Sequence, residues 1–127
     1  MKAPEDIESF LLQMDVQYDV PQDNMWVVKG MGPEVVVVHT DPVLAFRVKV
    51  IDLKSVPEGR RPDLFRTLLE LNSGEMLHGA YGLEQGAVVA TAALQLENLD
   101  FNEFQATIDD LVMAVTKHYP RLSKLAA

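Results

Sequence analysis

The sequence predicts an α+β fold in the order α-β-β-β-α-β-β-α, an antiparallel five-stranded sheet with three helices. Apolar residues recur at helical spacing in three segments and alternate with a period of two in the segments between them. Pro and Gly residues fall singly between these segments, as turns in a compact chain rather than as linkers. At 127 residues the chain is expected to form one domain spanning residues 1–127.

The first helix is predicted over residues 4–15. Pro4 suits the first position of a helix, and Glu5 and Asp6 place negative charge in the first turn, where the helix dipole favours it. The apolar stripe of this helix consists of Ile7, Phe10, Leu11 and Met14.

Three strands are predicted over residues 25–29, 34–40 and 44–52. The last alternates between apolar and polar residues, which indicates one buried face and one wet face. Residues 35–38 are four valines in a row, so this strand is apolar on both faces. It is either a covered central strand, which is the favoured interpretation, or a strand that presents an apolar surface to a partner.

A second helix is predicted to end near Asn72 and Gly74. A hairpin then pairs residues 79–83 with 87–96, and Gly86 supplies the positive φ that a tight turn needs.

The last helix is predicted to begin at Asp100, because Glu103 three residues later completes a capping box. Pro120 is expected to stop or kink this helix near Tyr119.

Charge and composition exclude several classes of function. The formal net charge of −8 is the wrong sign for attraction to nucleic acid or anionic lipid. No apolar run approaches the roughly 20 residues of a membrane span, and the first residues lack the apolar core of a signal peptide. The absence of cysteine suits a reducing compartment, so a cytoplasmic protein is expected.

No residue pattern indicates catalysis, a cofactor or a metal. His39, His78 and His118 are far apart in sequence, and none has a second ligand at metal-binding spacing. The serines lie outside nucleophile-elbow patterns, and the glycines lack dinucleotide-binding spacing. We therefore expect no enzyme, no cofactor and no metal.

The remaining candidates are apolar. Trp26 is the only tryptophan, and filling the core is its default role. If Trp26, Val36 and Val38 are exposed, they form an apolar patch of the kind that binds a partner protein.

Four segments carry a resemblance to a known family: residues 68–72 (Leu-Leu-Glu-Leu-Asn), 79–83 (Gly-Ala-Tyr-Gly-Leu), 88–96, and Leu99-Asp100 leading into the last helix. In these segments and in the order of elements over nearly the whole chain, the sequence resembles the YbjN-like proteins. These are similar in fold to the CesT-type chaperones of type III secretion.

The resemblance implies a small, acidic, cytoplasmic homodimer that binds client or partner segments on apolar patches and strand edges. By position, it implies a dimer interface that includes Leu64, Phe65 and Leu68. Two functions stay open: a chaperone-like protein-binding module, which leads, and a regulator of signalling or stress that acts through one defined protein partner. An enzyme is the third reading.

Overall fold

The computed structural model describes residues 1–126, which form three helices and six strands. The helices are α1 (Pro4–Met14), α2 (Arg61–Gly74) and α3 (Phe101–Ser123). The strands are β1 (Gln17–Gln22), β2 (Met25–Lys29), β3 (Val35–Thr40), β4 (Val43–Asp52), β5 (Ala80–Glu84) and β6 (Ala87–Gln95). Two short 3₁₀ turns, Leu53–Ser55 and Glu58–Arg60, connect β4 to α2.

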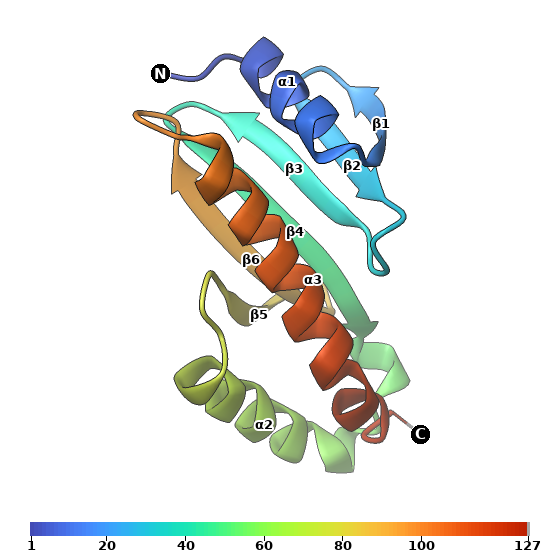
Figure 1. Cartoon of the computed structure of the whole chain (residues 1–127). Coiled ribbons are helices and arrows are strands. Elements are labelled where there is room, and N and C mark those ends of the chain that lie inside the picture. Colours follow the sequence, from blue (N-terminus) through green and yellow to red (C-terminus); the bar gives the residue numbers. More distant parts are fainter. Residues whose placement is uncertain (127) are drawn as a thin grey trace.

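All six strands form one antiparallel sheet in the order β1-β2-β3-β4-β6-β5 (Figure 1). The α+β class and the antiparallel pairing are therefore confirmed. The prediction of five strands is wrong by one, because β1 was missed. This strand lies at the edge of the sheet, is exposed at five of its six positions and contains Pro21, so it carries no alternating apolar pattern.

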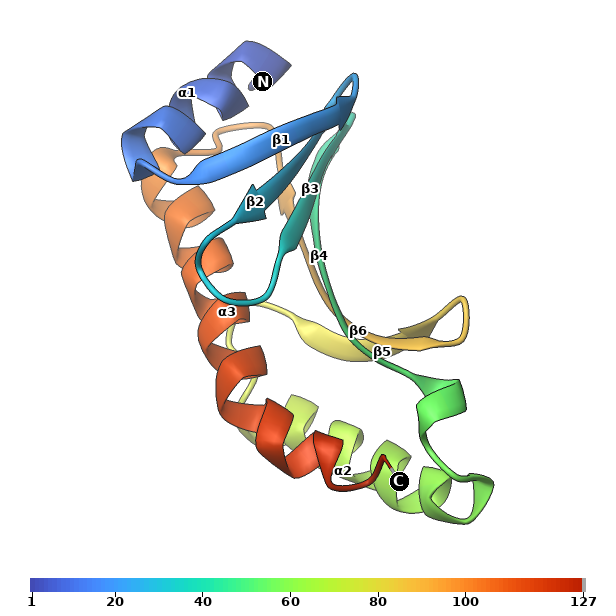
Figure 2. The same ribbon diagram turned by 90° about the vertical axis from the view of Figure 1, so that its right-hand side faces the viewer.

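The helices lie on one side of the sheet. Viewed along the sheet, α1 and α3 stand on the same side of β2, β3 and β4, and α2 lies at the β5 end (Figure 2). α3 packs on β4 and β6, α1 packs on α3, and α2 packs on β5. Within residues 1–126, no helix covers the opposite face of β2, β3 and β4 (Figure 2).

The core between the sheet and the helices is one connected apolar cluster. Phe10 of α1 stacks at a tilt against Phe104 of α3 with ring centroids 5.3 Å apart, and Phe104 lies 5.8 Å from Phe46 of β4. Tilted pairs at this separation are favourable, so the three rings join α1, α3 and the sheet.

The ends of α3 test two predictions. The capping box is confirmed, since Asp100 accepts a bond from the Glu103 amide at 2.8 Å and the Glu103 carboxylate accepts one from the Asp100 amide at 3.3 Å. A stop at Pro120 is excluded, because α3 continues through Pro120 to Ser123.

Gly79 occupies a position where no side chain fits. A Cβ added there would lie 2.3 Å from the backbone oxygen of Thr91 and 3.1 Å from a methyl carbon of Leu111. Because the closer atom belongs to the backbone of β6, it cannot rotate away, so a side chain at residue 79 would force the start of β5 away from β6.

We therefore expect Gly79→Ala to lower the free energy of unfolding by about 1–3 kcal/mol, the usual cost of forcing an extra carbon into a filled site. Urea unfolding followed by circular dichroism measures it. Gly74→Ala is the matched control, because nothing lies within 4 Å of a Cβ there and alanine is the better helix former. Equal stability of the two variants would contradict the close approach at Gly79.

Candidate protein-binding surfaces

The outer face of the sheet carries two rows of cross-strand neighbours. Register places the first row across β2, β3, β4 and β6 as Met25, Val38, Ala45 and Ala93. The second row is Val27, Val36, Arg47 and Thr91. We call these eight residues the outer sheet face. All are at least partly exposed, and six of them are apolar.

The structure separates the three residues proposed for partner binding. Val36 and Val38 are partly exposed on the outer sheet face. Trp26 is not with them: it alternates with Met25 and Val27 along β2, so it points to the helix side, and only 1% of it is exposed. Its indole nitrogen donates to the Glu8 carboxylate at 3.2 Å. An exposed patch that includes Trp26 is therefore excluded by its burial.

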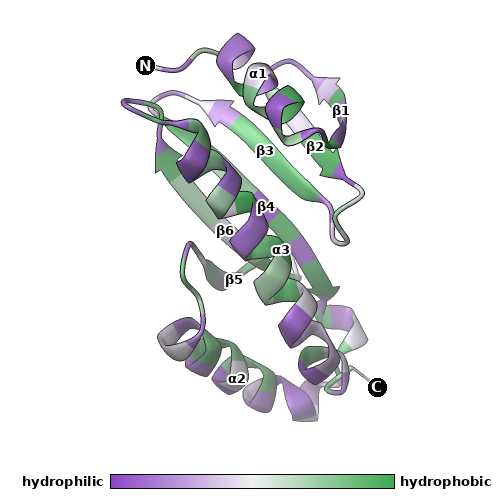
Figure 3. Ribbon diagram, in the orientation of Figure 1, coloured by the Kyte–Doolittle hydropathy of each residue, from purple (hydrophilic) through white to green (hydrophobic). Residues whose placement is uncertain are grey.

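The four valines of β3 left two alternatives open, a covered central strand and a strand with an apolar surface for a partner, and the structure shows features of both. It is an interior strand between β2 and β4, with Val35 and Val37 fully buried beneath the helices. Its other face, however, is not covered by a helix within residues 1–126 (Figure 2). Figure 3 shows β3 as a largely apolar strand in the middle of the sheet. One side of this strand thus belongs to the core and the other to the surface.

The three residues implied for a dimer interface, Leu64, Phe65 and Leu68, also differ in their exposure to solvent. Leu64 and Leu68 are 0% and 5% exposed and belong to the core, so only Phe65, which is partly exposed, is available to a second subunit. Sequence position placed them together, but a helix presents residues one position apart to different sides.

Two further apolar residues lie on the elements beside Phe65. Leu69, one helical turn after Phe65 on α2, is 69% exposed, and Leu83 on β5 is 52% exposed. β5 is an edge strand of the sheet. We call Phe65, Leu69 and Leu83 the α2–β5 surface. The sequence shows that Phe65 and Leu69 are spaced (i, i+4) and therefore share one side of the helix. It does not show that this side is exposed.

A groove lies on the helix side of the molecule, between α3 and the segment 75–79 that joins α2 to β5. Its volume is about 570 Å³. Apolar side chains that line it include Met31, Met76, Leu77 and Met113.

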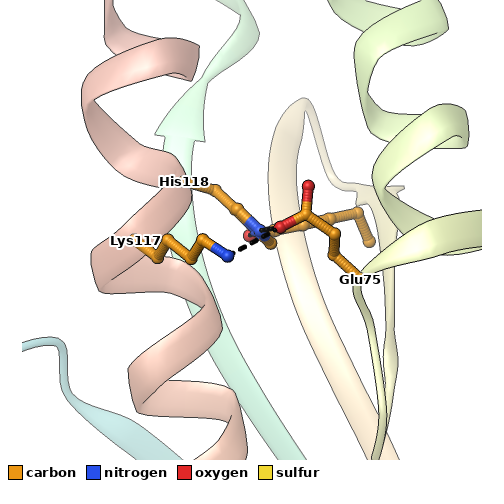
Figure 4. A network of polar contacts seen from close by, with 4 residues as sticks. Glu75, Lys117 and His118 are labelled. Carbon is orange, nitrogen blue, oxygen red and sulfur yellow. Dashed lines mark hydrogen bonds and ion pairs between the residues drawn. The ribbon is translucent and has the colours of Figure 1, made fainter.

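Polar contacts hold segment 75–79 against α3. The Glu75 carboxylate bonds Lys117 at 3.0 Å and the ring of His118 at 3.3 Å, as Figure 4 shows. The hydrogen bond from Lys117 is the largest cause of a lowered pKa of the Glu75 carboxyl, and the hydrogen bond from His118 is the next. His78 makes a second connection, an ion-pair contact with Asp110 of α3.

His118 is buried, with 4% of it exposed. Its Nδ1 lies 2.8 Å from the Tyr81 hydroxyl of β5, and its Nε2 faces Glu75. A neutral ring that donates from Nε2 and accepts the Tyr81 proton at Nδ1 satisfies every bond. The sequence showed no partner for His118, whereas the structure makes this residue a buried link between α3, β5 and the end of α2.

Asn72 makes a comparable link. Its side-chain oxygen accepts from the Tyr81 amide at 2.7 Å, and its nitrogen donates to the Tyr81 carbonyl at 3.1 Å. The Asn72 side chain thus forms hydrogen bonds with both the backbone amide and the backbone carbonyl of Tyr81 on the edge strand β5. The helix-stop signal at Asn72 concealed this role, because the amide's partner lies nine residues away.

Burial, and after it the nearby charge of Glu75, raise the pKa of Tyr81 to about 12. The folded protein therefore keeps this proton at pH values where the unfolded chain, with a pKa of 10.0, has lost it. The resulting stabilisation is complete below pH 10.0 and is lost as the pH rises toward about 12.

Titration of phenolate absorbance is expected to show one of the three tyrosines ionising near pH 12, and Tyr81→Phe should remove that component. Tyr119→Phe is the control, since Tyr119 is 46% exposed. If the Tyr81→Phe protein, shown to be folded, keeps the late component, the assignment to Tyr81 is wrong.

Within the described residues, no group of three or more His, Cys, Asp or Glu side chains is placed to hold a metal ion. His39 bonds the Lys2 carbonyl at 2.9 Å, so each of the three histidines has a separate local partner. Among residues 1–126, no helix is both long enough and apolar enough to cross a membrane.

The fold defines a class of protein, that of small α+β proteins with one antiparallel sheet and three helices. The model of the CesT_Tir_1 family matches residues 1–127, and the chain belongs to this family. Comparison with curated proteins found no match.

Three solved structures show the same fold. A chain of the ExoU–SpcU complex from the type III secretion system of Pseudomonas aeruginosa is 21% identical, with a TM-score of 0.70 over 94% of this chain and 97% of that chain. YbjN from E. coli is 11% identical, with a TM-score of 0.72 over 99% and 96%. The Yersinia pestis type III secretion chaperone SycH, solved with a fragment of YscM2, is 11% identical, with a TM-score of 0.64 over 90% and 97%. The resemblance to YbjN and the secretion chaperones is confirmed.

Proposed function

We propose that this chain is a non-enzymatic, chaperone-like module that binds a segment of a client or partner protein in the cytoplasm. The observation that carries the proposal is the outer sheet face, where six of the eight residues are apolar and where no helix covers the sheet within residues 1–126 (Figure 2). Contiguous exposed apolar surface of this kind marks interaction sites.

The relatives support the same class of function. SycH is named as a secretion chaperone and was solved with a protein fragment, and HopA1–SchA is named as a chaperone–effector complex. We propose that this chain likewise works by binding protein. Its bound segment contacts Val36 and Val38 on the outer sheet face.

We further propose that the protein is a homodimer joined through the α2–β5 surface. Leu69 and Leu83 are among the large apolar side chains that are more than half exposed, and an apolar surface on a helix beside an edge strand suits self-association. Phe65 is the part of the implied interface that fits this geometry.

Co-purification with the paired variant Val36→Lys, Val38→Lys tests the binding proposal. We expect partners recovered with the native protein to be lost with this variant, because two lysines on neighbouring positions of one face replace apolar contacts with charge that must be desolvated. The matched control is Val20→Lys, at a position that is 50% exposed on the edge strand β1.

The identity of the recovered proteins separates the two functions. Several secreted or partly unfolded clients support a chaperone, and one folded protein supports a regulator acting through one defined partner. Recovery of the same proteins by the Val36→Lys, Val38→Lys variant would contradict the outer sheet face as the binding surface.

A further inference from the structure

The two edges of the sheet differ in how they oppose pairing with another chain. An edge strand presents unpaired N–H and C=O groups, to which a strand of another molecule can add. On the edge strand β1, Pro21 lacks an N–H, and the register with β2 is interrupted between Asp19 and Gln22. Both features oppose pairing. The other edge strand, β5, contains no proline and pairs with β6 without interruption, so protection of this edge must come from another element.

The hairpin register identifies the backbone groups of β5 that point outward. Glu84 pairs with Ala87 across a two-residue turn, and residues that flank such a turn exchange hydrogen bonds. Bonded and unbonded pairs alternate along an antiparallel ladder, so Tyr81 belongs to an unbonded pair with Ala90. The N–H and C=O of Tyr81 therefore point away from β6, toward the free edge of the sheet.

Asn72 of α2 bonds both of these outward groups. Its side-chain oxygen accepts from the Tyr81 amide at 2.7 Å, and its side-chain nitrogen donates to the Tyr81 carbonyl at 3.1 Å. Two residues in a bonded pair of antiparallel strands exchange bonds in the same way. Asparagine and glutamine are the side chains that combine a neutral acceptor and a neutral donor in one planar amide. The Asn72 amide thus takes the place of the peptide groups of a further strand.

The end of α2 does not account for this asparagine. α2 continues past Asn72 to Gly74, and neither residue has the left-handed φ with which asparagine or glycine ends a helix. Asparagine is also a weaker helix former than alanine or leucine. The bonds to Tyr81 are therefore the structural reason for Asn72 on this helix.

Tyr81 lies in the middle of the β5 edge. Because outward groups recur at every second residue, Gly79 and Leu83 face the same edge on either side of Tyr81. A strand that adds to this edge has to pair with consecutive outward residues. Asn72 removes the central one, and α2, which packs on β5, holds Asn72 in place (Figure 1).

We infer that Asn72 caps the β5 edge and prevents a second copy of this chain from adding its own β5 strand there. The proposed dimer then joins through the side chains of the α2–β5 surface, and the sheet does not continue from one subunit into the other. This consequence rests on the proposed dimer, whereas the cap itself does not.

Asn72→Ala removes both bonds and tests the cap. Amide hydrogen exchange followed by nuclear magnetic resonance is expected to become about tenfold or more faster at Tyr81, because its N–H loses its hydrogen bond on an open edge. As the variant is concentrated, we expect the amides of Tyr81 and Leu83 to become protected. We also expect the molecular mass from light scattering to rise above that of the native protein, because strands pair along the freed edge.

Asn102→Ala is the matched control, because Asn102 is an exposed asparagine on α3. It should leave both the exchange rates and the molecular mass unchanged. The native protein supplies a second, independent measurement: exchange at Leu83 should not depend on protein concentration while Asn72 is in place.

Two outcomes overturn the inference. One is a folded Asn72→Ala protein that keeps the native mass and shows no protection of Leu83 on concentration, since Asn72 would then only link α2 to β5. The other is protection of Leu83 that increases with concentration in the native protein, and this measurement stands even if Asn72→Ala does not fold. A native protein that is monomeric at every concentration removes the dimer proposal, but association of Asn72→Ala through β5 would still support the cap.

Discussion

Replacing Trp26 by alanine is expected to lower the free energy of unfolding by about 3–5 kcal/mol, the cost of removing a large aromatic side chain from a filled core. Trp26 is 1% exposed and lies between β2 and α1, where Glu8 accepts its indole proton. Urea unfolding followed by far-ultraviolet circular dichroism measures the loss. A loss of this size is a large part of the stability of a domain of this length.

Trp26→Phe and Val36→Ala separate packing from surface exposure. Trp26→Phe keeps an aromatic ring and loses the bond to Glu8, so we expect a smaller cost than for alanine. Val36→Ala removes a partly exposed side chain and should cost less than about 1 kcal/mol. If Trp26→Ala left stability unchanged and instead reduced partner binding, Trp26 would belong to the surface and the buried position would be wrong.

If the protein forms the proposed dimer, replacing Phe65 and Leu69 together by glutamate is expected to convert it to a monomer. Association through the α2–β5 surface would bury both positions, and an unpaired carboxylate there must be desolvated without compensation. Removal of two central apolar side chains typically weakens an interface by about a hundredfold or more. Light scattering coupled to size exclusion measures the molecular mass across a range of concentrations.

The controls for this experiment address folding and location. Leu12→Glu changes a residue of α1 that is 70% exposed, and it should leave the molecular mass of the native assembly unchanged. Leu64→Ala should reduce stability without changing the mass of the folded protein, because Leu64 is in the core. A native protein that is monomeric at every concentration would remove the dimer proposal, and a dimer that survives both glutamates would place the interface elsewhere.

The helices, strands and turns were predicted from patterns of neighbouring residues. These predictions are confirmed where the tertiary structure favours the same local conformation. The capping box at Asp100 and Glu103 involves residues three apart, so the sequence contains the whole interaction. Gly86 was predicted in the hairpin turn, and it has a φ of 77° there. β1 was missed since an exposed edge strand needs no apolar alternation. Its clearest signal was Asn24, whose φ of 64° turns the chain from β1 into β2.

The candidate site was predicted less well than the fold. Val36 and Val38 were chosen for their apolar character, and the structure places them on an open face. Trp26, Leu64 and Leu68 share that character, yet they lie in the core. An apolar side chain is more stable out of water, whether it is buried in the core or in an interface with another protein. The type of residue therefore cannot distinguish a core position from an interface position.

By itself, the sequence determined the helices, the turns and all strands but one, as well as the acidic charge, because these follow from interactions between residues a few positions apart and from simple counts. Only the tertiary structure decided which apolar residues stay exposed, that Gly79 must lack a side chain, and that Tyr81, His118 and Glu75 meet. The physical reason is that exposure and contact between distant segments depend on sheet order and helix placement, and these arise from the free energy of the whole chain rather than from any one segment of it.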